Sequence, residues 1–360
     1  MNDTPLERYQ RDLKRKGFVA DIAQQRAVDS LQRVYDELNA PRPKLRFSLR
    51  RPRPEPVQGL YLWGGVGRGK TYLMDCFFET LPLRRKLRTH FHRFMLDVHQ
   101  RRKRYLEEQD PVALVAEEIA GEARVLCFDE FFISDIADAM ILGRLTEVLF
   151  REGVTLVATS NVEPDGLYRG GLQRERFVPA IERIKANCRV LHVDSPNDFR
   201  LRALTAAPLY YTPANSEAEA AFRRMFERLS GDTYAQDVEI DILGRPVLTR
   251  RVASDVVWFD FKDLCRTARA AADYIELSRC YHTVLLSGLP QLREADEDTA
   301  RRFVNLVDEF YDRGVKLVIA ADVPMLEIYA GRRLAFEFQR TESRLIEMQS
   351  EEYLQRPHLT

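Results

Sequence analysis

The sequence predicts an α/β fold in which helices cover both faces of a parallel sheet, followed by an additional α/β region. Short apolar stretches alternate with helical patterns over residues 59–196, as parallel strands joined by helices do. A similar rhythm returns in the last third of the chain. We therefore expect an N-terminal helix and connector over 1–58, a core over 59–196 and a C-terminal region over 197–360, which could be a degenerate repeat of the core.

Composition excludes several classes of protein. No stretch approaches the roughly 18 apolar residues of a membrane span, and the first residues lack the apolar segment of a secretory signal. Five scattered cysteines without a C-x-x-C pair predict reduced thiols, so we expect a cytoplasmic protein. The net charge is zero, but residues 1–110 carry 24 basic and 14 acidic side chains against 31 and 41 in the remainder. This basic part could face a polyanion.

The N-terminal region combines a helix with a connector. Apolar residues recur at three- and four-residue steps over residues 19–38, which predicts an amphipathic helix. Five prolines interleaved with basic residues follow between Pro41 and Pro56. This density of proline forbids a regular helix and predicts an extended basic connector.

In the core, apolar runs predict five strands and at least two helices. We expect strands at 60–63, 89–95, 124–128, 154–159 and 189–193, and helices at 71–81 and 135–150. After residue 196, the stretch 238–252 resembles an antiparallel hairpin. Beyond it, 283–286 and 315–320 repeat the two strand patterns of the core, and they should be buried as in a sheet covered on both faces.

A glycine-rich loop between the first strand and helix is the most specific signal. It reads Gly64, Gly65, Val66, Gly67, Arg68, Gly69, Lys70 and Thr71, which satisfies G-x-x-x-x-G-K-[ST]. Backbone N–H groups of such a loop cradle phosphates, and the following helix adds its positive dipole end. Lys70 would reach the β- and γ-phosphates of ATP, and the Thr71 hydroxyl would bind Mg²⁺.

Acidic and polar residues end two further strands. Asp129 would hold Mg²⁺ through water, and Glu130 would polarise the attacking water. In nucleotide hydrolases that insert a strand between the phosphate-loop strand and the acidic strand, a polar residue at the end of that strand contacts the γ-phosphate. Asn161 is the better candidate for this role, with Ser160 behind it. These features predict a P-loop ATPase.

An arginine that neutralises charge in the transition state would complete the site. Arg169, Arg174 and Arg176 follow the inserted strand, and any one of them could instead be a solvated surface residue. Such an arginine raises the rate by ~10³–10⁵ where its effect has been measured.

The motifs resemble those of AAA+ ATPases and, more narrowly, the family of the bacterial cell-division ATPase ZapE and its mitochondrial relatives. The phrases that carry the resemblance are 59–64, 128–131, 158–161, 171–174 with Phe177, 272–274 and 343–348. The resemblance implies that Arg174 is the arginine finger, acting in trans within a homo-oligomer. It also implies that the partner is FtsZ, and that the protein is recruited to the inner membrane face at the division site.

The resemblance extends to the N-terminal helix and departs from the family pattern at one point. The Asp21-x-x-x-Gln25 phrase matches and would lie near the adenine. The compact helical lid of typical AAA+ chains is missing after the core, so Arg344 is a candidate only for the sensor arginine of such a lid.

Two alternatives remain open from the sequence. A nucleic-acid-associated ATPase of the helicase-loader type would use Arg42–Arg53 and Arg101–Arg104 to bind phosphates, although Phe47 alone supplies an aromatic ring in the first segment. A nucleotide-binding scaffold without hydrolysis is disfavoured by Glu130. If the C-terminal region is a repeat, it lacks a second phosphate loop and should bind no nucleotide.

Overall fold

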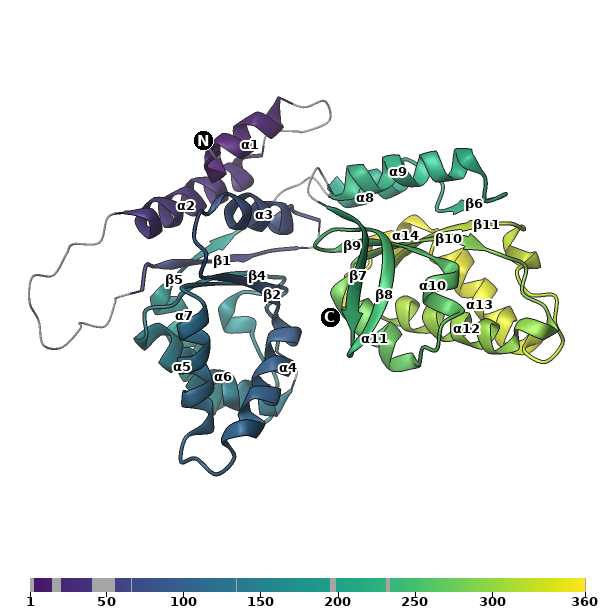
Figure 1. The fold of residues 1–360 in the computed structure, drawn as a ribbon. Helices are drawn as coiled ribbons and strands as arrows, with labels where there is room; N and C mark the ends of the chain where they lie inside the picture. Colours follow the sequence, from purple (N-terminus) through teal and green to yellow (C-terminus); the bar gives the residue numbers. More distant parts are fainter. Residues whose placement is uncertain are drawn as a thin grey trace, which may run out of the picture. The chain divides into compact units, whose positions relative to one another are not determined.

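The computed structural model describes residues 3–14, 21–40, 56–65, 67–133, 135–194, 199–230 and 234–359. The chain forms two compact units, Met1–Asn197 and Asp198–Thr360 (Figure 1). Almost all of the expected basic connector, including Arg42–Arg53, lies outside the described residues. Within the part of the chain that is described, no helix has the length and hydropathy needed to cross a bilayer.

The first unit is built on a five-stranded parallel sheet with the strand order β2-β3-β4-β1-β5. Its elements are α1 (Pro5–Leu13), α2 (Ile22–Asn39), β1 (Gly59–Trp63), α3 (Lys70–Thr80), β2 (Lys86–His90), α4 (Phe91–Arg102), α5 (Pro111–Glu122), β3 (Val125–Asp129), α6 (Ile136–Arg151), β4 (Thr155–Ser160), α7 (Arg174–Asn187) and β5 (Cys188–His192). Strand β4 lies between β1 and β3, so the predicted insertion is confirmed.

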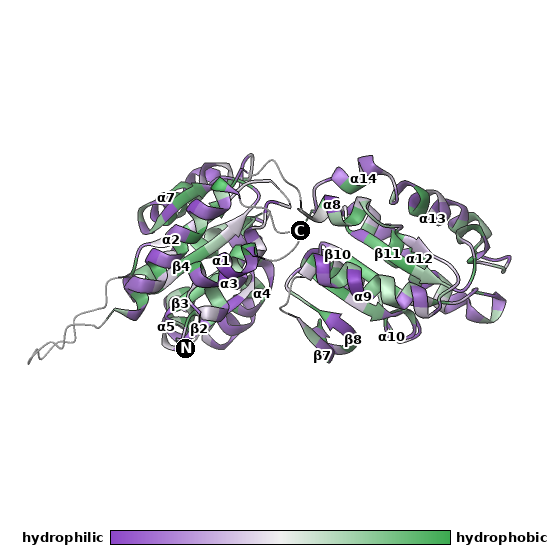
Figure 2. Cartoon of the chain, turned by 90° about the horizontal axis from the view of Figure 1, so that it is seen from above, coloured by the Kyte–Doolittle hydropathy of each residue, from purple (hydrophilic) through white to green (hydrophobic). Residues whose placement is uncertain are grey.

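Helices cover both faces of this sheet, as predicted. Helices α1–α3 pack on one face over the side chains of Leu60, Leu62 and Cys127. Helices α4–α7 pack on the other face over Leu126 and its neighbours. Figure 2 shows hydrophobic strands inside and hydrophilic residues on the outer helix surfaces. All five cysteines of the chain are buried and none forms a disulfide.

The strand expected at residues 89–95 is wrong. Strand β2 ends at His90 and α4 begins at Phe91. Phe91, Phe94, Met95 and Val98 recur at helical spacing and are all buried, which is the amphipathic pattern of a helix. Helices α1 and α5 were not predicted either, although Thr4 and Asp110 cap their N-termini.

The second unit contains a six-stranded mixed sheet with the order β6-β11-β10-β9-β8-β7. Its elements are α8 (Phe199–Thr205), β6 (Tyr210–Tyr211), α9 (Ser216–Ser230), β7 (Ala235–Ile242), β8 (Arg245–Val252), β9 (Val256–Asp260), α10 (Phe261–Cys265), α11 (Ala271–Cys280), β10 (Thr283–Leu289), α12 (Glu297–Asp312), β11 (Lys316–Ala321), α13 (Ala335–Glu347) and α14 (Glu351–Gln355). The predicted hairpin is confirmed as the antiparallel pair β7–β8. The predicted burial of β10 and β11 is confirmed over 283–286 and 315–320.

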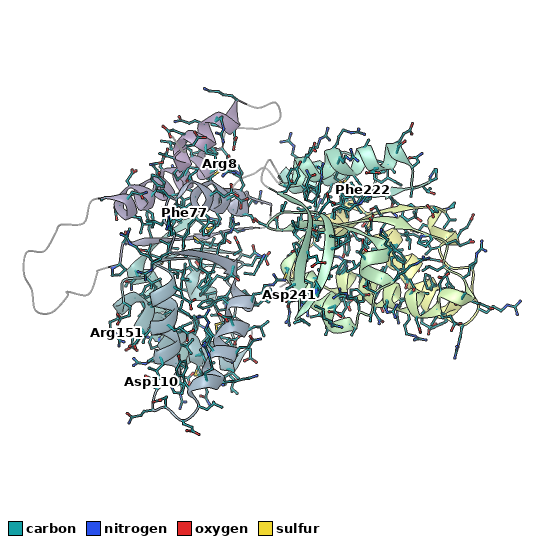
Figure 3. All side chains as sticks on the ribbon, viewed as in Figure 1. Arg8, Phe77, Asp110, Arg151, Phe222 and Asp241 are labelled. Carbon is teal, nitrogen blue, oxygen red and sulfur yellow. The ribbon has the colours of Figure 1, made fainter. Side chains whose placement is uncertain are left out.

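Two aromatic side chains show how helices close one face in each unit. Phe77 of α3 lies in the cluster under α1–α3, and Phe222 of α9 packs against Trp258 of β9 with ring centroids 5.5 Å apart (Figure 3). Helices α8, α9 and α14 share this second cluster, whereas α10–α13 cover the opposite face. Each unit therefore has an apolar layer on both sides of its sheet.

Parts of the two units follow one another at a constant spacing of 161 residues. Helix α12 starts 161 residues after α6, β11 after β4 and α13 after α7, and two 3₁₀ turns, Pro164–Gly166 and Met325–Glu327, keep the same spacing. The parallel order β2-β3-β4-β1 corresponds to β9-β10-β11-β6.

A tyrosine hydrogen bond repeats as well. The Tyr61 hydroxyl donates to the Val162 carbonyl at 3.0 Å, and the Tyr210 hydroxyl donates to the Val323 carbonyl at 2.8 Å. The two acceptors are also 161 residues apart, and each tyrosine lies on the strand beside β4 or β11.

Residues 353–358 close the second unit against the start of β11. The buried Lys316 ammonium donates to the carbonyls of Tyr353 at 3.0 Å and Arg356 at 2.8 Å. His358 is buried and makes a short hydrogen bond with the carbonyl of Ser278. Arg344, a candidate sensor, instead forms ion pairs with Asp308 and Asp312 within this unit.

Candidate functional site

The glycine-rich loop occupies the turn between β1 and α3, as the sequence predicts. Gly64, Gly67 and Gly69 have φ angles of 148°, 75° and 81°, which side chains rarely adopt. A Cβ atom on Gly64 would lie 2.4 Å from the Val193 carbonyl oxygen. Glycine is therefore required at Gly64 by both conformation and space. Val66, within the same loop, lies outside the described residues.

The Lys70 ammonium lies inside the curl of this loop. It donates to the carbonyls of Gly64 and Gly65, both at 2.7 Å, and to Asn161 Oδ1 at 3.1 Å. Lys70 is the first residue of α3, and Thr71 follows it in the same turn. The structure thus brings the end of β4 to the loop lysine, as the sequence reasoning predicts for Asn161.

Ser160 has a different role from Asn161. Its buried hydroxyl donates to the Phe131 carbonyl at 2.8 Å and accepts from Val162 N–H at 3.2 Å. These bonds tie together the segments that leave β3 and β4. Ser160 therefore holds the backbone, whereas the Asn161 amide reaches the phosphate loop.

Asp129 and Glu130 stand at the carboxyl end of β3, beside β4. Asp129 is buried, and Glu130 has a φ of 54°, with its N–H donating to Thr159 Oγ1 at 3.3 Å. A nitrogen of His90 lies 3.8 Å from a Glu130 oxygen. Burial lowers the pKa of His90 below its ordinary value, which favours the neutral ring near neutral pH.

An arginine that the sequence did not single out binds Asp129. Arg88 Nε donates to Asp129 Oδ2 at 2.6 Å, and a terminal nitrogen donates to Oδ1 at 3.3 Å. The other terminal nitrogen makes a short contact with Asp75 of α3. Burial lowers the pKa of Arg88, but the negative charges of Asp129 and Asp75 outweigh it and raise the pKa above its ordinary value. The guanidinium is therefore charged.

A cavity of about 670 Å³ opens beside Asn161. It is lined by Trp63, Phe132, Ile133, Asn161, Val162, Glu163, Gly166, Tyr168, Arg169, Gly170 and Gly171. Trp63 stacks on His192 with ring centroids 3.9 Å apart, which fixes one wall. Of the three candidate arginines, Arg169 lines this cavity.

Arg174 is the first residue of α7 and bonds within its own loop. Its guanidinium donates to the Asp165 carbonyl at 2.5 Å. Its Nε is buried without a hydrogen-bond partner in the structure. Arg176 is exposed on the same helix. The described contacts of Arg174 do not join it to Lys70, Asp129 or Glu130 of its own chain.

Helix α2 meets the phosphate loop through Gln24 rather than Gln25. Gln24 is buried, and its amide nitrogen donates to the Arg68 carbonyl at 3.2 Å. Its carbonyl oxygen Oε1 is buried without a hydrogen-bond partner in the structure. Gln25 instead donates to Asp29 on the surface of α2, although the sequence match had placed Gln25 near the adenine.

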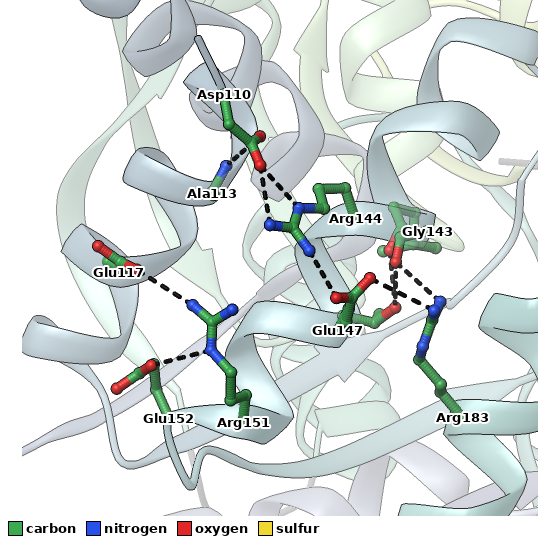
Figure 4. A network of polar contacts seen from close by, with 11 residues as sticks. Asp110, Ala113, Glu117, Gly143, Arg144, Glu147, Arg151, Glu152 and Arg183 are labelled. Carbon is green, nitrogen blue, oxygen red and sulfur yellow. Dashed lines mark hydrogen bonds and ion pairs between the residues drawn. The ribbon is translucent and has the colours of Figure 1, made fainter. Parts of the chain in front are cut away.

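Basic side chains of α4 and the following 3₁₀ turn are compensated by acidic partners. Arg101 pairs with Asp97, Glu118 and Glu122, and Arg104 pairs with Glu118. A second network, drawn in Figure 4, joins Arg144, Arg151 and Arg183 to Asp110, Glu117, Glu147 and Glu152. These pairings leave less free positive charge on the core helices than the sequence count indicates.

The parallel sheet with an inserted strand, the glycine-rich loop and the acidic pair at the next strand end define a P-loop ATPase. The sequence matches the family described as AFG1-like ATPase over residues 3–357. The chain therefore belongs to the AFG1-like ATPase family.

Curated relatives include a bacterial and a vertebrate protein. The chain is 48% identical to "Cell division protein ZapE" of Escherichia coli K12, over 99% of this chain and 98% of that protein. It is 40% identical to "Lactation elevated protein 1 homolog B" of Danio rerio, over 84% of this chain and 69% of that protein. Among solved structures, that of DnaI shares 20% identity with a TM-score of 0.37, over 51% of this chain and 88% of that one. A likeness at this level says nothing about function.

Proposed function

We propose that the first unit binds ATP in the Gly64–Thr71 loop and hydrolyses it with Glu130. The observation that carries this proposal is the Lys70 ammonium held between two loop carbonyls and Asn161. Phosphate oxygens of ATP would take the place of these acceptors, since an ammonium group binds anions more strongly than neutral carbonyls. Asn161 would then contact the γ-phosphate, and Glu130 would polarise the attacking water.

The residues present suit Mg²⁺. The hydroxyl of Thr71 and the carboxylate of Asp129 are oxygen donors, which this ion prefers. Asp129 is buried beside a charged arginine, which favours its ionised form. Bound there, Mg²⁺ would neutralise charge on the β- and γ-phosphates. Thr71 would hold it directly and Asp129 through water.

Glu130→Gln tests the division of roles between the two acids. The variant should bind a non-hydrolysable ATP analogue with Mg²⁺ as tightly as the parent and hydrolyse ATP slowly, because the amide cannot accept a proton from water. Calorimetry and a phosphate-release assay measure the two properties. A variant that binds no nucleotide would contradict these roles.

Arg174 is proposed to act in trans, in a homo-oligomer. Its contacts within its own chain involve the loop before α7 and not the acidic pair. Arg174→Ala subunits mixed with Lys70→Ala subunits should regain activity, because a hybrid interface pairs an intact loop with an intact finger. Equal activity of the parent in monomeric and assembled fractions would contradict the proposal.

The cellular role is proposed from the 48% identity to the cell division protein over nearly the whole chain. In this proposal the protein is cytoplasmic, is recruited to the division site and uses ATP hydrolysis to act on FtsZ assemblies. Sedimentation of purified FtsZ with the protein and ATP should show co-sedimentation and altered polymer mass, and Glu130→Gln should alter the nucleotide response. Unchanged FtsZ sedimentation would contradict it.

The nucleic-acid alternative is less well supported. Its proposed surface includes Arg101 and Arg104, which are paired with acidic side chains. Binding to DNA that weakens steeply as salt rises would favour this alternative over FtsZ.

We propose that the second unit is a degenerate copy of the first and binds no nucleotide. The constant 161-residue spacing, the matching order of four parallel strands and the repeated tyrosine bond support the duplication. Residues 212–215 replace the phosphate loop between β6 and α9, and they contain no glycine or lysine. Calorimetry with a non-hydrolysable ATP analogue should therefore give one site per chain.

A further inference from the structure

The buried contact between Arg88 and Asp129 is the strongest feature that the proposed roles leave unexplained. Strand register places Arg88 beside Cys127 and His90 beside Asp129, so Arg88 and Asp129 lie on the face covered by α3. Asp75 approaches from α3, the helix that begins with Lys70. The guanidinium thus joins the phosphate-loop helix to the strand that ends in the acidic pair.

Electrostatics gives this contact a role beyond packing. The side chains of Arg88 and Asp129 are 12% and 6% exposed, and a carboxylate buried without a cation tends to take up a proton. A protonated Asp129 could not serve as an anionic partner of Mg²⁺. The charged guanidinium therefore keeps the carboxylate ionised when no metal is bound.

The geometry leaves room for metal-bound water. An ionised carboxylate has about four acceptor sites, and the arginine fork occupies one on each oxygen of Asp129. The remaining sites can accept hydrogen bonds from water bound to Mg²⁺. Because two nitrogens hold the carboxylate, its plane is fixed before nucleotide arrives, which lowers the cost of organising the site.

The second unit offers an internal comparison. Its strand register places Trp258 where Arg88 stands and Ser287 where Asp129 stands. The Trp258 ring nitrogen donates to the Ser287 hydroxyl at 2.9 Å. In the unit without the phosphate loop, both members of the pair are therefore replaced together by a neutral hydrogen-bonded pair.

We propose that Arg88 is a positioning residue for the ATPase site, which keeps Asp129 ionised and oriented to receive the Mg²⁺ of the nucleotide. The inference rests on the proposed function of the first unit. Because Arg88 would act through Asp129, its loss should weaken the response to Mg²⁺ and not the contact between the loop and the phosphates.

Calorimetric titration of a non-hydrolysable ATP analogue, with Mg²⁺ or with EDTA, separates these two effects. Arg88→Met should lose about 10–100-fold in affinity with Mg²⁺, the range found when partners of metal ligands are removed, and should match the parent in EDTA. Arg88→Lys keeps the charge without the two-nitrogen fork and should fall between them. Asp75→Asn keeps the Arg88–Asp129 contact and should retain most of the Mg²⁺ response.

Arg101→Met is the matched control. Arg101 is another poorly exposed arginine, with its side chain 18% exposed and paired to three carboxylates, but it lies on α4 away from β3. It should bind the analogue as the parent does in both conditions. If Arg101→Met lost the Mg²⁺ response to the same extent, general stability of the unit would explain the result, and the proposal would be wrong.

Three other outcomes are decisive. Equal loss for Arg88→Met with Mg²⁺ and in EDTA would place the arginine's effect in the loop and overturn the proposal. Should Arg88→Met not fold, parent-like Mg²⁺ dependence of Arg88→Lys would overturn the need for the fork. A parent that binds the analogue without any Mg²⁺ effect would overturn the proposed metal role itself, a failure distinct from that of Arg88.

Discussion

The ends of corresponding strands differ between the two units. Asp129, Glu130 and Asn161 end β3 and β4 in the first unit, and Ser287, Gly288 and Asp322 hold the matching positions in the second. Glu130 and Gly288 even share a positive φ, at 54° and 74°.

The strand interiors, in contrast, remain apolar in both units. Leu156 and Leu317 occupy matching places and are both buried. The comparison separates two requirements: buried strands maintain the sheet, whereas a few polar residues at one edge determine whether nucleotide can bind.

The largest expected effect would come from removing the lysine that distinguishes the first unit. Lys70→Ala should reduce the number of nucleotide sites from one per chain to none, and ATP hydrolysis to less than roughly a tenth of the parent rate, because the phosphates lose a positive charge. Phosphate release and calorimetry measure both. Lys262→Ala, an exposed lysine of the second unit, is the control. Residual binding by Lys70→Ala at a second site would break the comparison.

Paired core substitutions should have similar effects in the two units. Leu156→Ala and Leu317→Ala remove matching buried side chains from β4 and β11, and each should lower the free energy of unfolding by about 2–5 kcal/mol. Hydrogen exchange read separately over each unit identifies which one has been destabilised. A negligible effect of Leu317→Ala alone would show that the second sheet does not depend on its core as the first does.

The smallest expected effect sharpens the comparison at the repeated tyrosine. Tyr61→Phe and Tyr210→Phe each remove one hydrogen bond to a loop carbonyl and should cost about 1 kcal/mol of stability. Because Val162 follows Asn161, Tyr61→Phe should also slow ATP hydrolysis, whereas Tyr210→Phe should leave it unchanged. Equal hydrolysis by the two variants would show that the bond does not position Asn161.

Sequence alone predicted those parts of the site that are contiguous in the chain. The loop ending in Lys70 has a fixed spacing, and Asp129 directly follows an apolar strand, so both can be recognised locally. Asn161 was found because the end of β4 is a known place for a polar contact. The same local signals gave the sheet and the hairpin.

Residues that act through long-range pairing could not be predicted. Arg88 contacts a carboxylate 41 positions away, and no spacing rule links the two. The strand that carries it was placed at 89–95, because apolar and aromatic residues of α4 were interpreted as a strand. Gln24 was passed over for Gln25, since the direction in which α2 faces the loop depends on tertiary packing.

The closure of the second unit by residues 353–358 has a consequence for synthesis on the ribosome. Lys316 and Ser278 find partners among Tyr353, Arg356 and His358, so this unit cannot complete its native contacts until residue 358 has left the exit tunnel. The first unit draws its structure from residues up to 197. At 5–20 residues per second, roughly 10–30 s of translation separate the two events. The nascent chain thus carries a folded phosphate-loop unit while the second unit is still incomplete, and can depend on a chaperone during that interval.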